Sequence, residues 1–296
     1  MGLFPGSRAQ AATPTDVFRQ VVQIQHTLEA IRQELDLPRH ERSLFPAENA
    51  TPREVFTQAE SLQVKIRNLL EEQARKHEPL LILKPEGKIT PDLVLQVVDY
   101  TRAMTRMLAD HLKIKVTVPK PVTQKKTPTD VFQAMIQVNR QANLMLKTRV
   151  NPSDVFLRVA ESIQYMDAVW MRLDPKGFEE LPLPVLDPSR KPADVYNQLL
   201  RCLRIQSEVL RLSGLKMMQL DRDYSAPAGT IPGDVYDLAS LMFSEVLPLH
   251  ASLPDPPLTP GAYYPGPKGP SEVFQQAKAL EGRLWRVFKF LRSERP

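Results

Sequence analysis

The chain has 296 residues, and its 42% hydrophobic content is enough for a folded core, which excludes wholesale disorder. Its net charge of +5 comes from 39 basic and 34 acidic residues spread along the whole length, without the concentrated basic stripe that nucleic-acid binding requires. The single cysteine excludes an internal disulfide, and no apolar run approaches the roughly 18 residues of a transmembrane helix.

Residues 1–12 precede the first predicted helix. The segment Ala9-Gln10-Ala11 matches the small-x-small pattern at which secretory leaders are cut. The residues before it are too few to hold both the basic and the apolar region of a leader. Either residues 1–12 are the remnant of a leader whose front lies upstream of Met1, or they are a disordered tail. The first interpretation predicts an exported, periplasmic bacterial protein, and the alternative is a cytoplasmic one.

The first predicted helix opens with TPTDVF at residues 13–18, and the same six letters recur at 127–132. A Thr before the helix caps a backbone amide, and Pro in the first helical position has no amide to leave unpaired. The acid two residues after Pro bonds back to the cap and faces the positive end of the helix dipole. The motif is therefore a helix start, with these structural residues: Thr13, Pro14, Asp16, Val17, Phe18, Thr127, Pro128, Asp130, Val131 and Phe132.

Near-copies of this motif continue along the chain with the pattern [TNK]-P-x-[DE]-V-[FY]. Their prolines are Pro14, Pro52, Pro91, Pro128, Pro152, Pro192, Pro232 and Pro270. After each Pro, apolar residues recur in alternating steps of four and three, which is the spacing of one helical face. The sequence thus predicts eight helices of about 20 residues, with the seventh ending or kinking early at Pro248.

The spacing between these prolines is 37 to 40 residues except for one step of 24, from Pro128 to Pro152. That short step divides the chain into two similar halves. We therefore predict an all-α fold of tandem duplicated four-helix bundles, 13–150 and 151–296, built from eight single-helix repeats with long Pro-rich connectors. Asn151, Lys191, Ile231 and Gly269 replace the cap threonines of the first half, so the helix starts of the second half are predicted to be less well capped.

The connectors are longer than the roughly 2–8 residues that join ordinary helical hairpins. About 16 extended residues can span some 50 Å, enough to run back along a helix. Successive helices could then start at the same end, and the alternative is an up-down bundle with the surplus loop over its ends. The sequence favours connectors that pack along the bundle.

No catalytic, cofactor or metal site is expected. The five histidines are not paired at metal-ligand spacing, and phosphate loops and hydrolase motifs are missing from the sequence. The repeated acids are explained as capping partners, the repeated aromatics as core, and Cys202 as a buried structural thiol.

The last connector, 253–269, contains six prolines and the adjacent Tyr263 and Tyr264. Extended Pro-rich backbone and paired tyrosines suit a partner contact. Alternatively, one ring anchors the loop on the bundle.

Taken together, these features predict a non-catalytic binding or scaffolding protein with an unidentified protein partner and no nucleic acid. If it is exported, it would be an accessory to a larger bacterial system. The alternative is a small-molecule sensor that binds its ligand between helices or at the junction of the halves.

Overall fold

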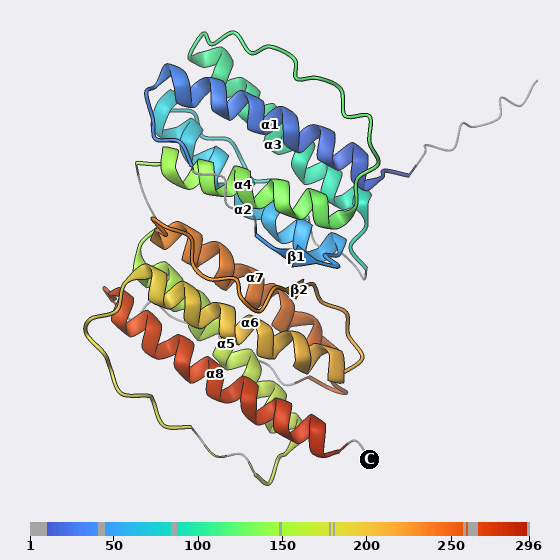
Figure 1. The fold of residues 1–296 in the computed structure, drawn as a ribbon, viewed down its shortest axis with the longest axis vertical. Coiled ribbons are helices and arrows are strands. Elements are labelled where there is room, and N and C mark those ends of the chain that lie inside the picture. The colour runs from blue at the N-terminus through green and yellow to red at the C-terminus, as the bar shows by residue number, and fades with distance from the viewer. Residues whose placement is uncertain are drawn as a thin grey trace, which may run out of the picture.

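The computed structural model describes residues 11–40, 45–83, 88–147, 150–177, 179, 181–256, 259 and 266–294. Most of the predicted tail 1–12 and both Tyr263 and Tyr264 lie outside the described residues. Within them the fold is a helical bundle, which confirms the predicted all-α class (Figure 1). Its helices are α1 Pro14–Glu34, α2 Pro52–Ala74, α3 Pro91–His111, α4 Pro128–Met145, α5 Pro152–Leu173, α6 Pro192–Leu212, α7 Pro232–Ala251 and α8 Pro270–Ser293.

Two short strands complete the described elements. Strand β1, Ala47–Glu48, pairs antiparallel with β2, Gln219–Leu220, and so joins the α1–α2 connector to the α6–α7 connector. The apolar connector stretches 80–83 and 114–118 form no strand. Helix α7 does not end at Pro248 but continues to Ala251. Pro248 lies in the last turn, where its missing amide removes one helical hydrogen bond, and its carbonyl still accepts from the Ser252 amide at 3.0 Å.

Every helix begins at the Pro of its repeat, and local hydrogen bonds explain why. The acid two residues after Pro accepts from the amide of the cap residue at seven starts; these acids are Asp16, Glu54, Asp130, Asp154, Asp194, Asp234 and Glu272. Thr13, Thr51, Thr127 and Asn151 also accept from an amide of the first turn.

Two starts differ from the predicted capping. Thr90 makes no side-chain cap bond, and its repeat carries Leu93 where the others carry the acid. Asn151 was predicted to be a poorer cap, but its side chain accepts from the amides of both Ser153 and Asp154, at 2.8 and 3.1 Å. An Asn carbonyl is as good an N-cap acceptor as a Thr hydroxyl. Weaker capping in the second half therefore applies to α6, α7 and α8 only.

The four helices of each half start at the same end. Pro14, Pro52, Pro91 and Pro128 surround one shallow depression together with the valines three residues after them. Pro152, Pro192, Pro232 and Pro270 do the same in the second half. Connectors therefore return along the outside of the helices, as the 112–127 segment does in Figure 1. This is the parallel arrangement that the sequence favoured.

In each half the first and second helices lie diagonally opposite one another, and so do the third and fourth. Helix α1 packs against α3 and α4, and α2 packs against the same two. The second half repeats this order, with α5 and α6 each packed against α7 and α8. The order is the same in both halves, as a duplicated unit requires, and helix-for-helix superposition stays a prediction.

A hydrogen bond connects the N-termini of neighbouring helices, and both of its partners occupy fixed positions in the repeat. The polar side chain directly after one Pro accepts from the amide two residues before the Pro of the neighbouring helix. This bond links Thr15 to Lys126, Thr129 to Ala50, Asp92 to Ala12, and Ser153 to Lys268, at 2.8–3.1 Å. The repeated motif thus specifies contacts between helices as well as the start of each one.

The repeated aromatics are only partly the core residues that the sequence predicted. Phe132 is fully buried, and Phe56 and Tyr196 are nearly so. Phe18, Phe156, Tyr236 and Phe274 are half-buried at the edge of the core. A cation from the neighbouring start covers three of these rings: Lys126 over Phe18, Lys268 over Phe156 and Arg190 over Phe274, at 4.4–5.4 Å from the ring centroid.

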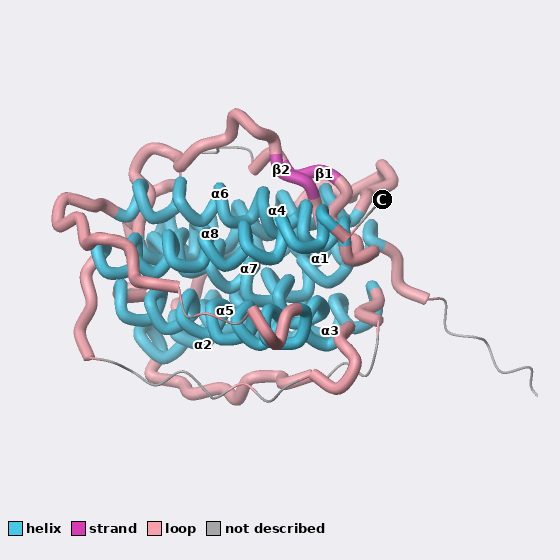
Figure 2. Tube along the Cα trace, turned by 90° about the horizontal axis from the view of Figure 1, so that it is seen from below, coloured by secondary structure: helices cyan, strands magenta, loops and turns pink. Residues whose placement is uncertain are grey.

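The two halves lie side by side and run in opposite directions (Figure 1). Figure 2 shows that the helices of both halves lie roughly along one common axis. Helix α5 starts close to where α4 ends, since only residues 146–151 separate them. Ion pairs across the boundary show the opposite directions. Arg53, near the start of α2, pairs with Glu245, which lies in the latter half of α7. Lys65, further along α2, pairs with Asp237, near the start of α7. Helices α2 and α4 form the first half's side of this boundary, and α7 forms most of the second half's side.

Candidate functional site

The boundary between the halves is polar at its centre. The Lys65 ammonium lies 2.6 Å from both carboxylate oxygens of Asp237 and 2.8 Å from Oδ1 of Asn139. Asp237 also accepts from Ser61 at 2.8 Å and from Asn143 at 3.0 Å. Lys65 is 4% exposed and Asp237 is 5% exposed. Burial lowers the pKa of Lys65, and the Asp237 carboxylate opposes that shift.

A second ion pair lies further along the same two helices. The Arg53 guanidinium binds Glu245 through two nitrogens and donates to the Lys216 carbonyl at 2.9 Å. Burial raises the pKa of Glu245 to about 7, although the bonds from Arg53 act in the opposite direction. Beside it, Glu54 accepts from the amide of Met218 at 2.9 Å while its other oxygen caps α2. The acid of one helix start thus also holds the α6–α7 connector.

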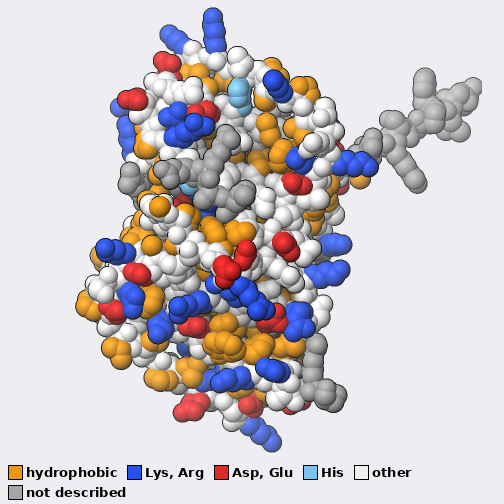
Figure 3. All heavy atoms as spheres, viewed as in Figure 1, with side chains coloured by type: hydrophobic (Ala, Val, Ile, Leu, Met, Phe, Trp, Pro, Cys, Tyr) orange, Lys and Arg blue, Asp and Glu red, His pale blue; other side chains and the backbone are white. Residues whose placement is uncertain are grey.

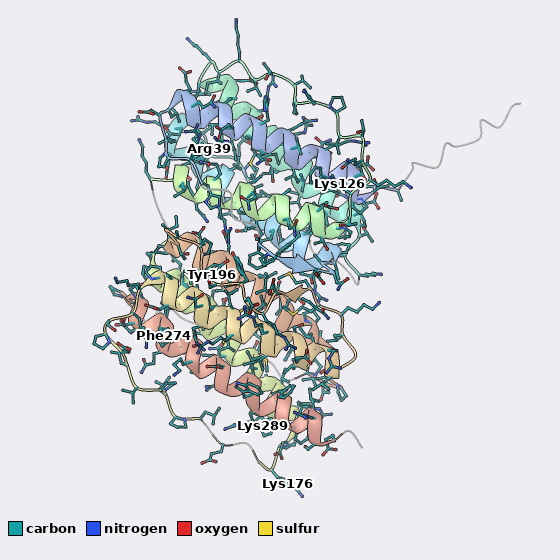
Figure 4. The ribbon with its side chains drawn as sticks, viewed as in Figure 1. Arg39, Lys126, Lys176, Tyr196, Phe274 and Lys289 are labelled. Atoms are coloured by element: carbon teal, nitrogen blue, oxygen red, sulfur yellow. The ribbon has the colours of Figure 1, made fainter. Side chains whose placement is uncertain are left out.

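A third contact joins α4 to α6. The Arg140 guanidinium donates to the hydroxyls of Tyr196 and Tyr224 at 3.2 and 2.8 Å. Tyr196 points to the boundary from the second half (Figure 4). Burial raises the pKa of Tyr196 well above its usual value, so the phenol stays neutral and accepts from Arg140. These three contacts fix the two halves relative to one another.

Next to this network lies a cavity of about 440 Å³, which we call the inter-bundle cavity. Both halves and the segment between them form its walls. The lining residues are Thr57, Glu60, Ser61, Val64, Lys65 and Asn68 of α2; Leu146 and Val150 of the junction; Asp154 and Arg158 of α5; and Tyr236, Ser240, Phe243, Ser244 and Leu247 of α7.

Arg158 is held flat against the aromatic part of the wall. Its guanidinium carbon lies 4.9 Å from the centroid of the Phe243 ring and 5.7 Å from that of Tyr236. It also pairs with Glu161 at 2.8 Å and donates to the Tyr236 hydroxyl at 3.2 Å. The charge is therefore neutralised within α5 itself, and its plane forms part of the cavity surface.

Glu60 and Ser240 bring polar groups to the cavity without partners of their own. Glu60 is exposed to solvent, yet partial desolvation by its neighbours raises the pKa of its carboxyl to about 7. The Ser240 hydroxyl oxygen is buried and has no hydrogen-bond partner within the described part of the chain. Apolar walls with a few unengaged polar groups are typical of a ligand site.

None of the sequence-predicted site residues that the structure describes lines this cavity. The helix-start residues named for α1 and α4 lie at the end of the first bundle, where Pro14, Val17, Pro128 and Val131 surround the shallow depression. Cys202 is buried as expected, burial raises the pKa of its thiol far above the usual range, and it donates to the Ala277 carbonyl at 3.3 Å. Among the described residues, no group of three or more His, Cys, Asp or Glu side chains could hold a metal ion.

Sequence reasoning missed the residues that line the boundary, among them Lys65, Glu60, Arg158, Asp237 and Glu245. The sequence allowed a ligand at the junction of the halves as an alternative, but it assigned no residue to that site. The signal in the sequence that could have indicated these boundary residues was a charged residue directly beside the apolar face of a helix, such as Lys65 before Ile66.

Comparisons with protein-family models, with curated proteins and with solved structures found no match to this chain. No helix in the described part of the chain is long and apolar enough to cross a membrane.

Proposed function

We propose that this is a non-catalytic binding protein that holds a small organic molecule in the inter-bundle cavity. The observation that carries the proposal is the cavity itself, whose volume of about 440 Å³ falls within the roughly 300–1,000 Å³ of typical ligand pockets. It lies at an interface between two packed units, a common place for such sites.

The position of the cavity favours a sensor over a passive carrier. A ligand in it would contact α2 of the first half, α5 and α7 of the second, and the junction residues Leu146 and Val150. Occupancy would therefore favour one arrangement of the two halves over others, because a ligand shifts an equilibrium by its difference in affinity for the two states.

The experiment is a thermal-shift screen of the full chain against a panel of metabolites, since a ligand that binds only the folded state raises the melting temperature. Any hit is repeated on Ser240→Trp, which fills the cavity, and on the control Ser207→Trp, which places the same side chain on α6 outside it. The proposal expects the hit to be lost in Ser240→Trp and kept in Ser207→Trp. Equal shifts in both variants would place the ligand elsewhere.

The α5–α6 connector supports the second candidate function, protein scaffolding. Val185 is 94% exposed and Leu183 is 61% exposed, in an extended stretch that also exposes Leu186. Elsewhere, charges of both signs are intermixed with apolar side chains on the face seen in Figure 3. Adjacent exposed apolar side chains on one segment favour a protein contact. In this case Leu183→Lys/Val185→Lys would abolish capture of a partner while leaving the melting temperature unchanged, and unchanged capture would contradict it.

A further inference from the structure

Four charged residues line the inter-bundle cavity, and three of them are already engaged. Lys65 is held by Asp237 and Asn139. Arg158 is held by Glu161 and the Tyr236 hydroxyl. Asp154 accepts from the Asn151 amide as the capping acid of α5. Both cations of the wall are thus neutralised by protein groups before any ligand arrives.

Glu60 is the exception. It has no ion pair or hydrogen bond among the described residues, and desolvation alone accounts for the raised pKa of its carboxyl. Glu60 keeps contact with solvent, but its partial desolvation disfavours the charged form, and a nearby positive charge would favour it. The cavity therefore presents one acidic group that no described cation of the protein pairs with, and a positively charged ligand would supply that partner.

The other residues that line the cavity indicate what kind of molecule would carry this positive charge. Val64, Leu146, Val150, Phe243 and Leu247 supply apolar surface. The unpartnered Ser240 hydroxyl adds one neutral hydrogen-bonding group. An anion would place a second negative charge near Glu60, and a fully polar molecule would leave the apolar wall uncovered.

We infer that the inter-bundle cavity takes an organic cation, an amine with an apolar body whose ammonium group pairs with the Glu60 carboxylate. This inference rests on the proposed function and assigns its ligand class. The apolar body lies against the Phe243 side of the cavity.

Pairing with Glu60 makes the affinity depend on pH. The amine binds the ionised carboxylate, so the affinity should fall by about tenfold per pH unit as Glu60 is protonated below neutral pH, and level off above it. Besides Glu60, the charged or titratable groups that line the cavity are Lys65 of α2, Asp154 and Arg158 of α5, and Tyr236 of α7. Asp237 and Glu161 pair with two of these, and Arg53, Lys147 and Glu245 lie on the same elements. No ion pair or hydrogen bond of the described residues joins any of them to Glu60.

Calorimetric titration of the full chain with three probes of equal length tests the inference: hexylamine, hexanol and hexanoate. At about pH 8, where Glu60 is ionised, hexylamine should bind at least about tenfold more tightly than either of the others. Glu60→Gln should reduce the hexylamine affinity at least about tenfold and leave hexanol unchanged. The control Glu34→Gln makes the same charge change on an exposed residue of α1 and should alter neither.

The outcomes separate the ligand class from the proposed function. Hexylamine that binds no better than hexanol, or that binds Glu60→Gln and the unchanged chain equally, overturns the cation. Binding of hexanol or hexanoate that Ser240→Trp abolishes would then still keep the cavity as a ligand site. If no probe binds at millimolar concentration, the cation is also overturned, and the metabolite screen decides the proposed function separately.

Discussion

Replacing Asp237 by asparagine removes the charge that balances the buried Lys65 at the boundary between the halves. Asp237 accepts two bonds from Lys65 and one each from Ser61 and Asn143. The amide nitrogen of asparagine would face donors where a carboxylate oxygen now accepts. Removing one partner of a buried ion pair costs about 3–5 kcal/mol, because an uncompensated charge stays buried. We expect Asp237→Asn to lower the free energy of unfolding by about that amount.

Urea unfolding followed by two probes measures this loss and shows where it falls. Both tryptophans, Trp170 and Trp285, lie in the second half, so their fluorescence reports on that half alone, while circular dichroism reports on all helices. We expect the two transitions to separate in Asp237→Asn, because the contact that couples the halves is weakened.

Two further variants complete the test. The control Asp110→Asn breaks an exposed pair with Arg106, in which both side chains are more than half exposed, and should cost less than about 1 kcal/mol. The double variant Lys65→Met/Asp237→Leu should recover most of the stability, since well-packed apolar residues replace buried ion pairs at little cost. A loss below about 1 kcal/mol in Asp237→Asn, with coincident transitions, would refute the reasoning.

Three further predictions concern individual side chains. Thr127→Ala removes a cap bond and should cost about 0.5–2 kcal/mol in urea unfolding; Thr90→Ala removes no cap bond, and an equal cost would contradict the capping argument. Phe132→Ala should cost about 3–5 kcal/mol because its ring is fully buried, and a much smaller loss would mean that the ring is not core. The folded-state pKa of Glu60 lies above its ordinary value of 4.5, at about 7, so the native state binds more protons in this window and the Glu60 contribution to stability falls as pH rises through it. Glu60→Gln should remove this dependence of stability on pH, measured as the difference in unfolding free energy between the variant and the unchanged chain. The contribution of His40, whose burial lowers its pKa to about 4, is the same in both and cancels in that difference. An unchanged pH dependence would contradict the desolvation of Glu60.

The helices were predictable because each start depends on residues within a few positions of one another. Thr, Pro and acid act on the same first turn, so the motif alone locates every helix start. Where a local residue changed, the outcome changed with it: Leu93 occupies the acid position of α3, and Thr90 makes no cap bond. The parallel direction was not determined in this way, because long connectors can return along a helix but can equally fold over the ends of an up-down bundle.

The boundary between the halves was not predictable in the same way. Lys65 and Glu245 lie thirteen residues after the Pro of their helix, next to the apolar face that packs in the core. A charged residue at such a position ordinarily faces solvent. They are buried because α2 and α7 happen to be the helices that meet across the boundary. Which helices meet depends on how two finished bundles pack, and no spacing within one repeat encodes that choice.

The parallel bundles also account for the way in which the halves pack. Four parallel helices bring four positive dipole ends together, an arrangement that costs energy unless negative charge lies nearby. The repeated acids supply that charge at seven of the eight starts. Running the two bundles in opposite directions adds a second compensation, because it sets the positive end of one beside the negative end of the other.

This antiparallel packing also determines which residues of the repeat can reach the cavity. Glu60 and Ser240 both lie eight residues after their prolines, and Val64 and Ser244 both lie twelve after them. In each repeat the residues three, seven and ten positions after Pro face the core. The positions eight and twelve after Pro lie outside this apolar face and are free to differ among the eight copies. The repeated positions thus form the core of each half, and positions that differ among the repeats line the cavity. A search for the function of such a repeat protein should begin at the positions where its copies disagree.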